Sequence, residues 1–333
     1  MHGMKAILFH NPSSGTATGG HSPDELTAIL RLAGYDVTYC STKTRSFKPA
    51  LKKTYDLAVV AGGDGTVGKV LRGIKDRSMP VGIWPLGTAN NIATSLGITG
   101  TPHDIAAGWS PKRTRKLTIG LVEGPWGETP FVEAVGWGVM AEATDSSIGA
   151  EAEGNARLTL GRDAFREALT KAKARDLKVK IDGKPFDGKV LGLEILNIGY
   201  AGPGIPLRLA VDPGDDRLDV IVIREEHRED MLDWLGPAQE DKPAPVSVRR
   251  GAKIVVHWKG KPAMRIDDGF VEPPDTGKAR ITITLQEEPV TVWLPKPERA
   301  AKAKPKTARK AARKKTAAAK KPAKPKAKPR KRG

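Results

Sequence analysis

The sequence predicts an α/β protein: an N-terminal open, mostly parallel sheet with helices on both faces, then a C-terminal antiparallel β-sandwich and a disordered basic tail. Residues 1–118 alternate strand-like and helical runs, a cadence typical of parallel sheets with crossover helices. Strand-like runs dominate residues 119–297, and residues 298–333 have almost no apolar side chain larger than alanine. We therefore expect a nucleotide-binding domain at 1–118, a substrate domain at 119–297 and a tail at 298–333.

The elements of the first domain follow in chain order. Apolar runs predict its strands, and apolar residues spaced three and four apart predict its helices. The expected strands lie in MKAILFHNP, DVTYCS, DLAVVAGGDG and PVGIWPLG, and the expected helices in SPDELTAILRLAGY, TVGKVLRGIKDR and TANNIATSLG.

The second domain is expected to be built almost entirely from strands. One helix interrupts them, in ARLTLGRDAFREALTKAKA. The tryptophans Trp84, Trp137 and Trp258 lie on apolar strand runs, so we expect them in the core. The expected strands lie in FVEAVGWGV, LKVKIDGK, KVLGLEILNIGY, RLDVIVIRE, AKIVVHW, ARITITL and VTVWLP.

The formal net charge of +18 is concentrated in the tail. Residues 299–333 contain 17 Lys or Arg and no acid, which leaves residues 1–298 near +1. Such a segment cannot offset the entropy of ordering and should be disordered. Its natural partners are polyanions, either an anionic membrane surface or nucleic acid, and a plain solubility tail stays open.

Several classes of protein are disfavoured by composition. No apolar run approaches the roughly 20 residues of a spanning helix, and no export signal opens the chain, so we expect a cytoplasmic protein. The lone Cys40 allows no internal disulfide, and the six histidines lack the spacing of zinc ligands. The sequence contains no nucleophile elbow, so a hydrolase is disfavoured.

The motif GGDGT (residues 62–66) follows a strand and opens a helix. Such a turn presents free backbone N–H groups, which favours phosphate binding. Val70 after Lys69 replaces the hydroxyl with which a P-loop holds Mg²⁺. A carboxylate at Asp64 repels phosphate unless a cation lies between them, so we infer a Mg²⁺-dependent nucleotide site. A glycine turn with Asp64 as a helix cap is the alternative.

Two further polar loops follow neighbouring predicted strands. Side chains in these loops could bind a nucleotide or merely cap helices. Three such loops should meet at the carboxyl edge of the sheet, where open α/β folds place ligands. The polar and glycine residues are Asn11, Ser13, Ser14 and Gly15 in the first loop, and Thr88, Asn90 and Asn91 in the other.

With NPSSG, GGDGT and PLGTANN in this order and spacing, the chain resembles the diacylglycerol-kinase catalytic family of bacterial lipid kinases. The family is related to sphingosine and ceramide kinases and more distantly to NAD kinases and phosphofructokinases. The resemblance covers roughly residues 4–297, including GYAGPGIPLRLAVDPGDDRLDV, and stops before the tail. It implies an ATP site lined by Asn11, Gly63, Asp64, Gly65, Thr66 and Thr88, with Asn90 nearby.

The resemblance also implies a structural Mg²⁺ loop. Asp215 would match its acid, assisted by the backbone carbonyl of Leu218. The family usually has Asp-Asp-Gly, whereas this chain has Arg217 after Asp215 and Asp216. A plain surface turn is the alternative.

This chain departs from the family pattern at the position of the catalytic base. Relatives carry Asp-Gly-Glu, and that glutamate is thought to take the proton from the lipid hydroxyl; aligning Asp268 leaves Phe270 in its place. Asp268 itself, Asp267 and Glu272 are the candidate catalytic carboxylates. Glu133 stands where relatives commonly carry Asn. A pseudokinase that binds nucleotide or lipid without turnover stays open.

Together these features give the hypothesis of an ATP- and Mg²⁺-dependent lipid kinase. Its substrate would be diacylglycerol or a related lipid alcohol, and its place the inner membrane face, held there by the tail. The competing hypothesis is a degenerate kinase fold tethered by its tail to nucleic acid or membrane. The lipid and the oligomeric state, a homodimer included, are left open.

Overall fold

The structure is a computed structural model that describes residues 3–14, 20–146, 154–186, 188–236, 242–260, 263–272 and 277–297. The predicted disordered tail lies outside the described residues, as does Gly15 of the first loop. The other segments and residues predicted from the sequence lie in described parts of the chain.

The first lobe is a six-stranded sheet in the order β2-β1-β3-β4-β20-β5. Its first five strands run parallel, and only β5 runs antiparallel to its neighbour. Every residue of β3 is buried, as expected for a strand covered on both faces. The strands are β1 (Met4–His10), β2 (Tyr35–Ser41), β3 (Leu57–Gly62), β4 (Val81–Pro85), β5 (Thr114–Leu117) and β20 (Val290–Trp293).

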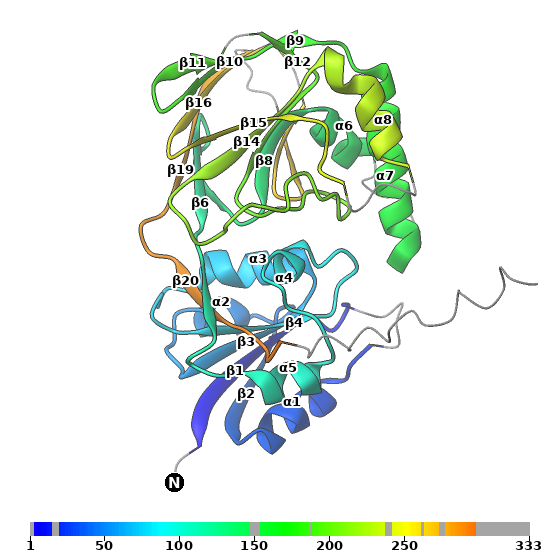
Figure 1. The fold of residues 1–333 in the computed structure, drawn as a ribbon. Coiled ribbons are helices and arrows are strands. Elements are labelled where there is room, and N and C mark those ends of the chain that lie inside the picture. Colours follow the sequence, from blue (N-terminus) through cyan, green and yellow to red (C-terminus); the bar gives the residue numbers. More distant parts are fainter. Residues whose placement is uncertain are drawn as a thin grey trace, which may run out of the picture. The chain divides into compact units, whose positions relative to one another are not determined.

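Helices cover both faces of this sheet, which confirms the predicted fold class (Figure 1). Helix α1 begins after Ser22, whose hydroxyl accepts a hydrogen bond from the Glu25 amide at 3.1 Å, and it buries Leu26 and Leu30. In Figure 1, α1 and α5 lie on one side of the sheet and α3 and α4 on the other. The helices are α1 (Pro23–Leu32), α2 (Phe47–Ala50), α3 (Asp64–Gly73), α4 (Asn91–Ser95) and α5 (Pro102–Gly108).

The second lobe contains two six-stranded antiparallel sheets, in the orders β11-β10-β16-β19-β6-β7 and β15-β14-β13-β8-β17-β18. A hydrophobic cluster fills the space between them, with Trp137 and Trp258 in edge-to-face contact at 6.5 Å between ring centroids. The sandwich and the buried tryptophans, Trp84 included, are therefore as predicted.

The strands of the sandwich are short, and most alternate core-facing with outward-facing residues. They are β6 (Gly120–Gly124), β7 (Gly127–Phe131), β8 (Ala134–Gly138), β10 (Lys178–Ile181), β11 (Lys184–Phe186), β13 (Gly192–Leu196), β14 (Leu218–Ile223), β15 (Ser247–Gly251), β16 (Ile254–Lys259), β17 (Met264–Ile266), β18 (Gly269–Val271) and β19 (Lys278–Leu285). A separate pair joins β9 (Arg175–Asp176) and β12 (Lys189–Val190).

Helices also pack on the outer face of the β8-containing sheet. The predicted helix is present as α7 (Gly154–Lys171), and it packs with α6 (Val139–Ser146) and α8 (Arg228–Trp234), which follows the 3₁₀ turn η2 (Glu225–His227). Helix α6 was not predicted from the sequence, because its first residues continue the apolar run of FVEAVGWGV. The strand ends at Gly138, whose φ of +79° turns the chain into the helix.

The chain returns to the first lobe at its end. Strand β20 pairs with β4 and β5, and Val290 and Val292 are buried in the first hydrophobic core. The predicted domain boundaries placed residues 290–293 in the second domain, whereas the structure places them in the sheet of the first lobe. Burying two valines in the first core favours this pairing. Both lobes lie in one compact unit, Met1–Lys296. In the described part of the chain, no helix has the length and apolar character needed to cross a membrane.

Candidate active site

The glycine turns that follow β3 and β4 touch each other. A Cβ atom added to Gly87 would lie 2.3 Å from the Cα of Gly63, so the close approach requires glycine at Gly87. Asp64, the first residue of α3, accepts a hydrogen bond from the amide of Ile92 in α4 at 2.9 Å. The second and third polar loops therefore meet at the sheet edge, as predicted.

The first polar loop begins beside the same edge. The amide of Asn11 donates to the carbonyl of Ala61 in β3 at 3.1 Å. The side-chain oxygen of Asn11 accepts from the amide of Ser13 at 3.2 Å, which closes a local turn. Asn11 is thus placed next to the end of β3, where its loop starts.

The predicted nucleotide-binding residues divide into two groups. Thr66 is buried. Asn90 has a φ of 51°, and its side-chain amide accepts from the N–H of Gly87 and donates to the carbonyl of Gly87, both at 2.9 Å. Thr66 and Asn90 therefore shape the loops. Gly65 and Thr88 are exposed. The exposed pair remains open to a ligand, together with the amides at the start of α3.

Carboxyl groups from both lobes approach one another beside the Gly63 turn. Burial raises the pKa of Asp64 to about 6, and the Asp268 carboxylate adds to the rise against hydrogen bonds from backbone amides. Burial, followed by the charges of Asp268 and Asp64, raises the pKa of Glu133 well above its usual value. Like charges oppose one another's ionisation, so a cation placed among them is stabilised.

The donor set fits a hydrated cation rather than a protein-only metal cage. Among the residues that the structure describes, no three Asp, Glu, His or Cys side chains are arranged to hold an ion by themselves. Mg²⁺ usually takes one or two carboxylates and completes its shell with water and substrate phosphates. Asp64 and Asp268 can supply that share, which fits the Mg²⁺ that a bound nucleotide would bring.

Glu133 lies in the link between β7 and β8 and is only 3% exposed. Its carboxyl accepts a hydrogen bond from the side-chain amide of Asn91 at 3.0 Å, and the same amide donates to the carbonyl of Gly202 at 2.9 Å. Asn91 belongs to the first lobe, and Glu133 and Gly202 to the second. These contacts therefore join the lobes at the site.

Asp267 makes a second contact between the lobes. Its carboxylate is bonded to the guanidinium of Arg72 on α3 and accepts from the amides of Val132 and Glu133, at 3.1 and 2.8 Å for one oxygen. Burial raises the pKa of Asp267, with Arg72 acting in the opposite direction. Because both oxygens are engaged, Asp267 is an anchor and is poorly placed to receive a substrate proton.

Asp268 and Glu272 occupy different ends of the β17–β18 hairpin. Ile266 pairs with Gly269, so Asp267 and Asp268 form the turn, and Asp268 is exposed there. Glu272 lies beyond Val271, about 13 Å from Asp268 along the extended chain. The structure thus brings Asp64, Asp267 and Asp268 together and leaves Glu272 apart from them.

A buried ion pair lies directly behind this turn. The side chains of Arg265 and Glu194 are at most 1% exposed, and 2.7 Å separates a guanidinium nitrogen from a carboxylate oxygen. The two residues lie on the strands that flank β8. Gly136 is the β8 residue between them, and a Cβ atom there would overlap the Glu194 carboxyl. Arg265 also donates to the backbone carbonyl of Asp267 at 2.6 Å, so the pair fixes the turn that carries Asp268.

The loop predicted to hold a structural metal is neutralised by arginine. The carboxylate of Asp215 is bonded to the guanidinium of Arg250 and accepts from the amide of Arg217 at 2.9 Å. Leu218 is buried at the start of β14, beside this loop. One carboxylate that is already paired with a guanidinium is a poor donor set for Mg²⁺, so these residues do not fit the ion.

Several residues of the site were not assigned a role from the sequence. Arg72 and Arg265 look like ordinary charged positions, since their partners come from distant strands. Glu133 and Glu194 did carry a signal, because each is a lone acid inside an apolar run, FVEAV and LGLEIL. An acid in such a run must be paired or neutral, which marks it for attention.

Comparison with known proteins agrees with this geometry. The family model described as diacylglycerol kinase catalytic domain matches residues 5–122. A diacylglycerol kinase of Bacillus subtilis is 27% identical over 68% of this chain and 76% of its own length, and one of Staphylococcus haemolyticus is 28% identical over 56% and 57%. This chain therefore spans little more than half of the second relative.

A solved structure shares the fold of both lobes. It is a crystal structure from Bacillus anthracis of a protein proposed to be a diacylglycerol kinase, with a TM-score of 0.65 and 18% identity, covering 88% of this chain and 98% of that one. The motifs GGDGT and PLGTANN lie on the turns described above, and residues 5–122, which contain them, are similar to the catalytic domain of diacylglycerol kinases.

Proposed function

We propose that this protein is a lipid kinase that transfers the γ-phosphoryl group of ATP to the hydroxyl of a lipid alcohol, diacylglycerol being the first candidate. One observation carries the proposal: the Gly63 turn, which opens α3 without a side-chain cap, lies beside the carboxylates Asp64 and Asp268. Phosphate-directed amides next to paired carboxylates suit a nucleotide that arrives with a divalent cation. The names of the relatives favour a lipid as the acceptor.

The nucleotide would lie across the touching turns. Amides at the start of α3 would bind its phosphates, with Gly65 and Thr88 at the open rim. Asn11, Thr66 and Asn90 would keep the three loops in shape. Mg²⁺ bound with the nucleotide supplies positive charge that offsets both the phosphates and the carboxylates of Asp64 and Asp268.

Asp268 is our candidate for the proton acceptor. It is exposed at the hairpin turn, and Asp267 and Arg265 hold that turn in place. The oxygen of the lipid hydroxyl forms a bond to the γ-phosphorus while the bond from that phosphorus to the bridging oxygen of ADP breaks. The hydroxyl proton passes to the carboxylate of Asp268, and ADP leaves. Phe270 has no group that can take the proton.

The alternative is a binding protein that has lost turnover, and the same assay decides between the two. Purified full-length protein is incubated with labelled ATP, Mg²⁺ and a total lipid extract, and labelled lipid is identified. A labelled phospholipid supports the kinase and names the acceptor. ATP binding without any labelled lipid would favour the binding protein.

The basic segment 298–333 would add attraction to anionic lipid. This role stays a prediction, as do a cytoplasmic location at the inner membrane face, an association with nucleic acid and a homodimer. The charge of the segment supports it, since each basic residue near an anionic leaflet contributes about 1 kcal/mol.

Replacing Asp268 by asparagine is expected to lower kcat by about 100-fold or more, because the substituted amide cannot accept the proton. The measurement is lipid phosphorylation at saturating ATP. Asp216→Asn is the matched control: its side chain is 93% exposed and lies in another loop, so activity should not change. Glu272→Gln is the third arm, and a loss of activity there but not in Asp268→Asn would move the base to Glu272.

A further inference from the structure

The outer face of the β11-β10-β16-β19-β6-β7 sheet is strongly basic. Along each strand the core-facing residues are apolar, such as Val179, Ile254 and Ile281, and their neighbours point outward. Outward, exposed basic residues of this sheet include Lys178, Lys180, Lys253, Lys259 and Arg280, which are here called the basic face; Lys278, paired with Lys259, is a further one.

Strand register gathers the basic face into one patch. Lys178 pairs with His257, and His257 pairs with Arg280 across β10, β16 and β19. In the next outward row, Lys180 and Thr282 flank the same β16 residue, Val255. Neighbouring strands lie about 5 Å apart, so Lys178 and Arg280, two strands apart, are about 10 Å from each other and contribute to one positive patch.

Among the described residues, the charges of the basic face have no ion-pair partner. The acids that share this face are Glu123 and Glu128, which lie opposite each other at the β6–β7 edge. Since residues 1–298 carry a net charge near +1, the face concentrates positive charge that is balanced elsewhere.

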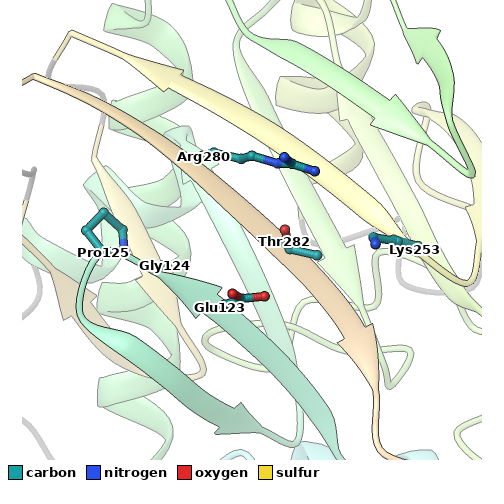
Figure 2. A pocket seen from close by; sticks show the side chains of 6 residues that line it. All are labelled: Glu123, Gly124, Pro125, Lys253, Arg280 and Thr282. Carbon is teal, nitrogen blue, oxygen red and sulfur yellow. The ribbon is translucent and has the colours of Figure 1, made fainter.

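A hollow of about 410 Å³ opens on this face (Figure 2). Arg280 and Lys253 lie at its rim with the hydroxyl of Thr282 between them, and Glu123 lies across from them. A guanidinium, an ammonium and a hydroxyl are the groups that bind phosphate oxygens. The hollow can therefore receive a phosphate headgroup on the side away from Glu123.

We propose that the basic face docks on an anionic phospholipid bilayer. The proposal rests on the proposed function, because a lipid kinase must work at the surface that holds its substrate. A broad sheet face presents its charges to a flat charged surface at once, whereas single-stranded nucleic acid is usually bound on several stacking aromatic side chains. The docking is electrostatic and should weaken as salt is added.

The test compares two full-length variants with equal loss of charge. Lys180→Gln/Lys253→Gln/Arg280→Gln removes three charges from the basic face. Arg31→Gln/Lys52→Gln/Lys53→Gln removes three exposed charges from the first lobe and is the matched control. Sedimentation with phosphatidylglycerol–phosphatidylcholine vesicles at 0.1 M salt measures the partition coefficient. We expect the face variant to bind about 100-fold more weakly and the control to bind like wild type.

The outcomes are separable. Equal losses in both variants would show non-specific attraction and would overturn the proposal, as would unchanged vesicle binding with reduced binding of double-stranded DNA. Activity on lipid dispersed in neutral detergent should be the same in both triple variants. If no variant phosphorylates lipid but the vesicle result holds, the proposed function fails and the docking face stands.

Discussion

Replacing Asp64 by asparagine is expected to abolish lipid phosphorylation, with a loss of at least about 100-fold in kcat at saturating ATP. Asp64 lies where the amides of α3 meet the carboxyl groups of the second lobe. Asparagine keeps the oxygen that accepts from the Ile92 amide, so the turn should be retained. It removes the negative charge that would hold the cation beside the phosphates. The measurement is product formation with labelled ATP.

The same variant should unfold less readily at neutral pH, which separates a lost role in the chemistry from a lost fold. Burial raises the pKa of Asp64 to about 6 from an ordinary value of 3.8. Between these values the folded state binds more protons than the unfolded state, so this group makes stability fall as pH rises. The variant lacks that contribution. Its advantage in the free energy of unfolding should reach on the order of 2 kcal/mol at pH 7.5 and shrink toward pH 4.5.

Urea denaturation without nucleotide measures this difference at both pH values. Full activity in Asp64→Asn would contradict the assigned role outright. Lost activity together with lost stability at pH 7.5 would instead identify Asp64 as a structural helix cap. Asp216→Asn, an exposed carboxylate in a separate loop, controls for the change of net charge.

The sequence predicted the fold because its signals are local. The buried run DLAVV and the glycines that follow it specify a strand, a turn and a helix within twenty residues, and the structure has β3 and α3 there. The helix α6 escaped because its first residues continue an apolar strand, and only the positive φ of Gly138 marks the break. Strand β20 was predicted as a strand but assigned to the wrong sheet, because the apolar pattern of VTVWLP would suit either sheet.

The site was predictable only as far as it is local. The motif GGDGT identifies Gly63 and Asp64, and the parallel sheet predicts that their turn lies next to the loop of Gly87. The partners from the second lobe could not be predicted from a local motif. Arg72 and Asp267 are 195 positions apart in the chain, and no pattern in either segment pairs them. Likewise, three carboxylates near Phe270 look equivalent in sequence, whereas hairpin register separates an anchor, an exposed turn residue and a remote one.

The buried pair of Arg265 and Glu194 supports the second large prediction. Arg265→Met leaves the fully buried carboxyl of Glu194 without its partner, and we expect a loss of about 3 to 5 kcal/mol in the free energy of unfolding. Burial already raises the pKa of Glu194 although Arg265 opposes the rise, so the loss should be smaller at low pH, where the carboxyl is neutral. Urea denaturation at pH 5 and pH 8 measures it.

Glu194→Leu/Arg265→Met tells stability apart from positioning. Replacing both charges by apolar groups removes the unpaired buried charge, so most of the lost stability should return. The hydrogen bond from Arg265 to the carbonyl of Asp267 does not return, and the turn that carries Asp268 stays unsupported. We therefore expect kcat to remain depressed by about tenfold, the equivalent of about 1.4 kcal/mol, in a protein as stable as wild type. Recovery of both stability and kcat would confine the pair to the core and remove it from the support of Asp268.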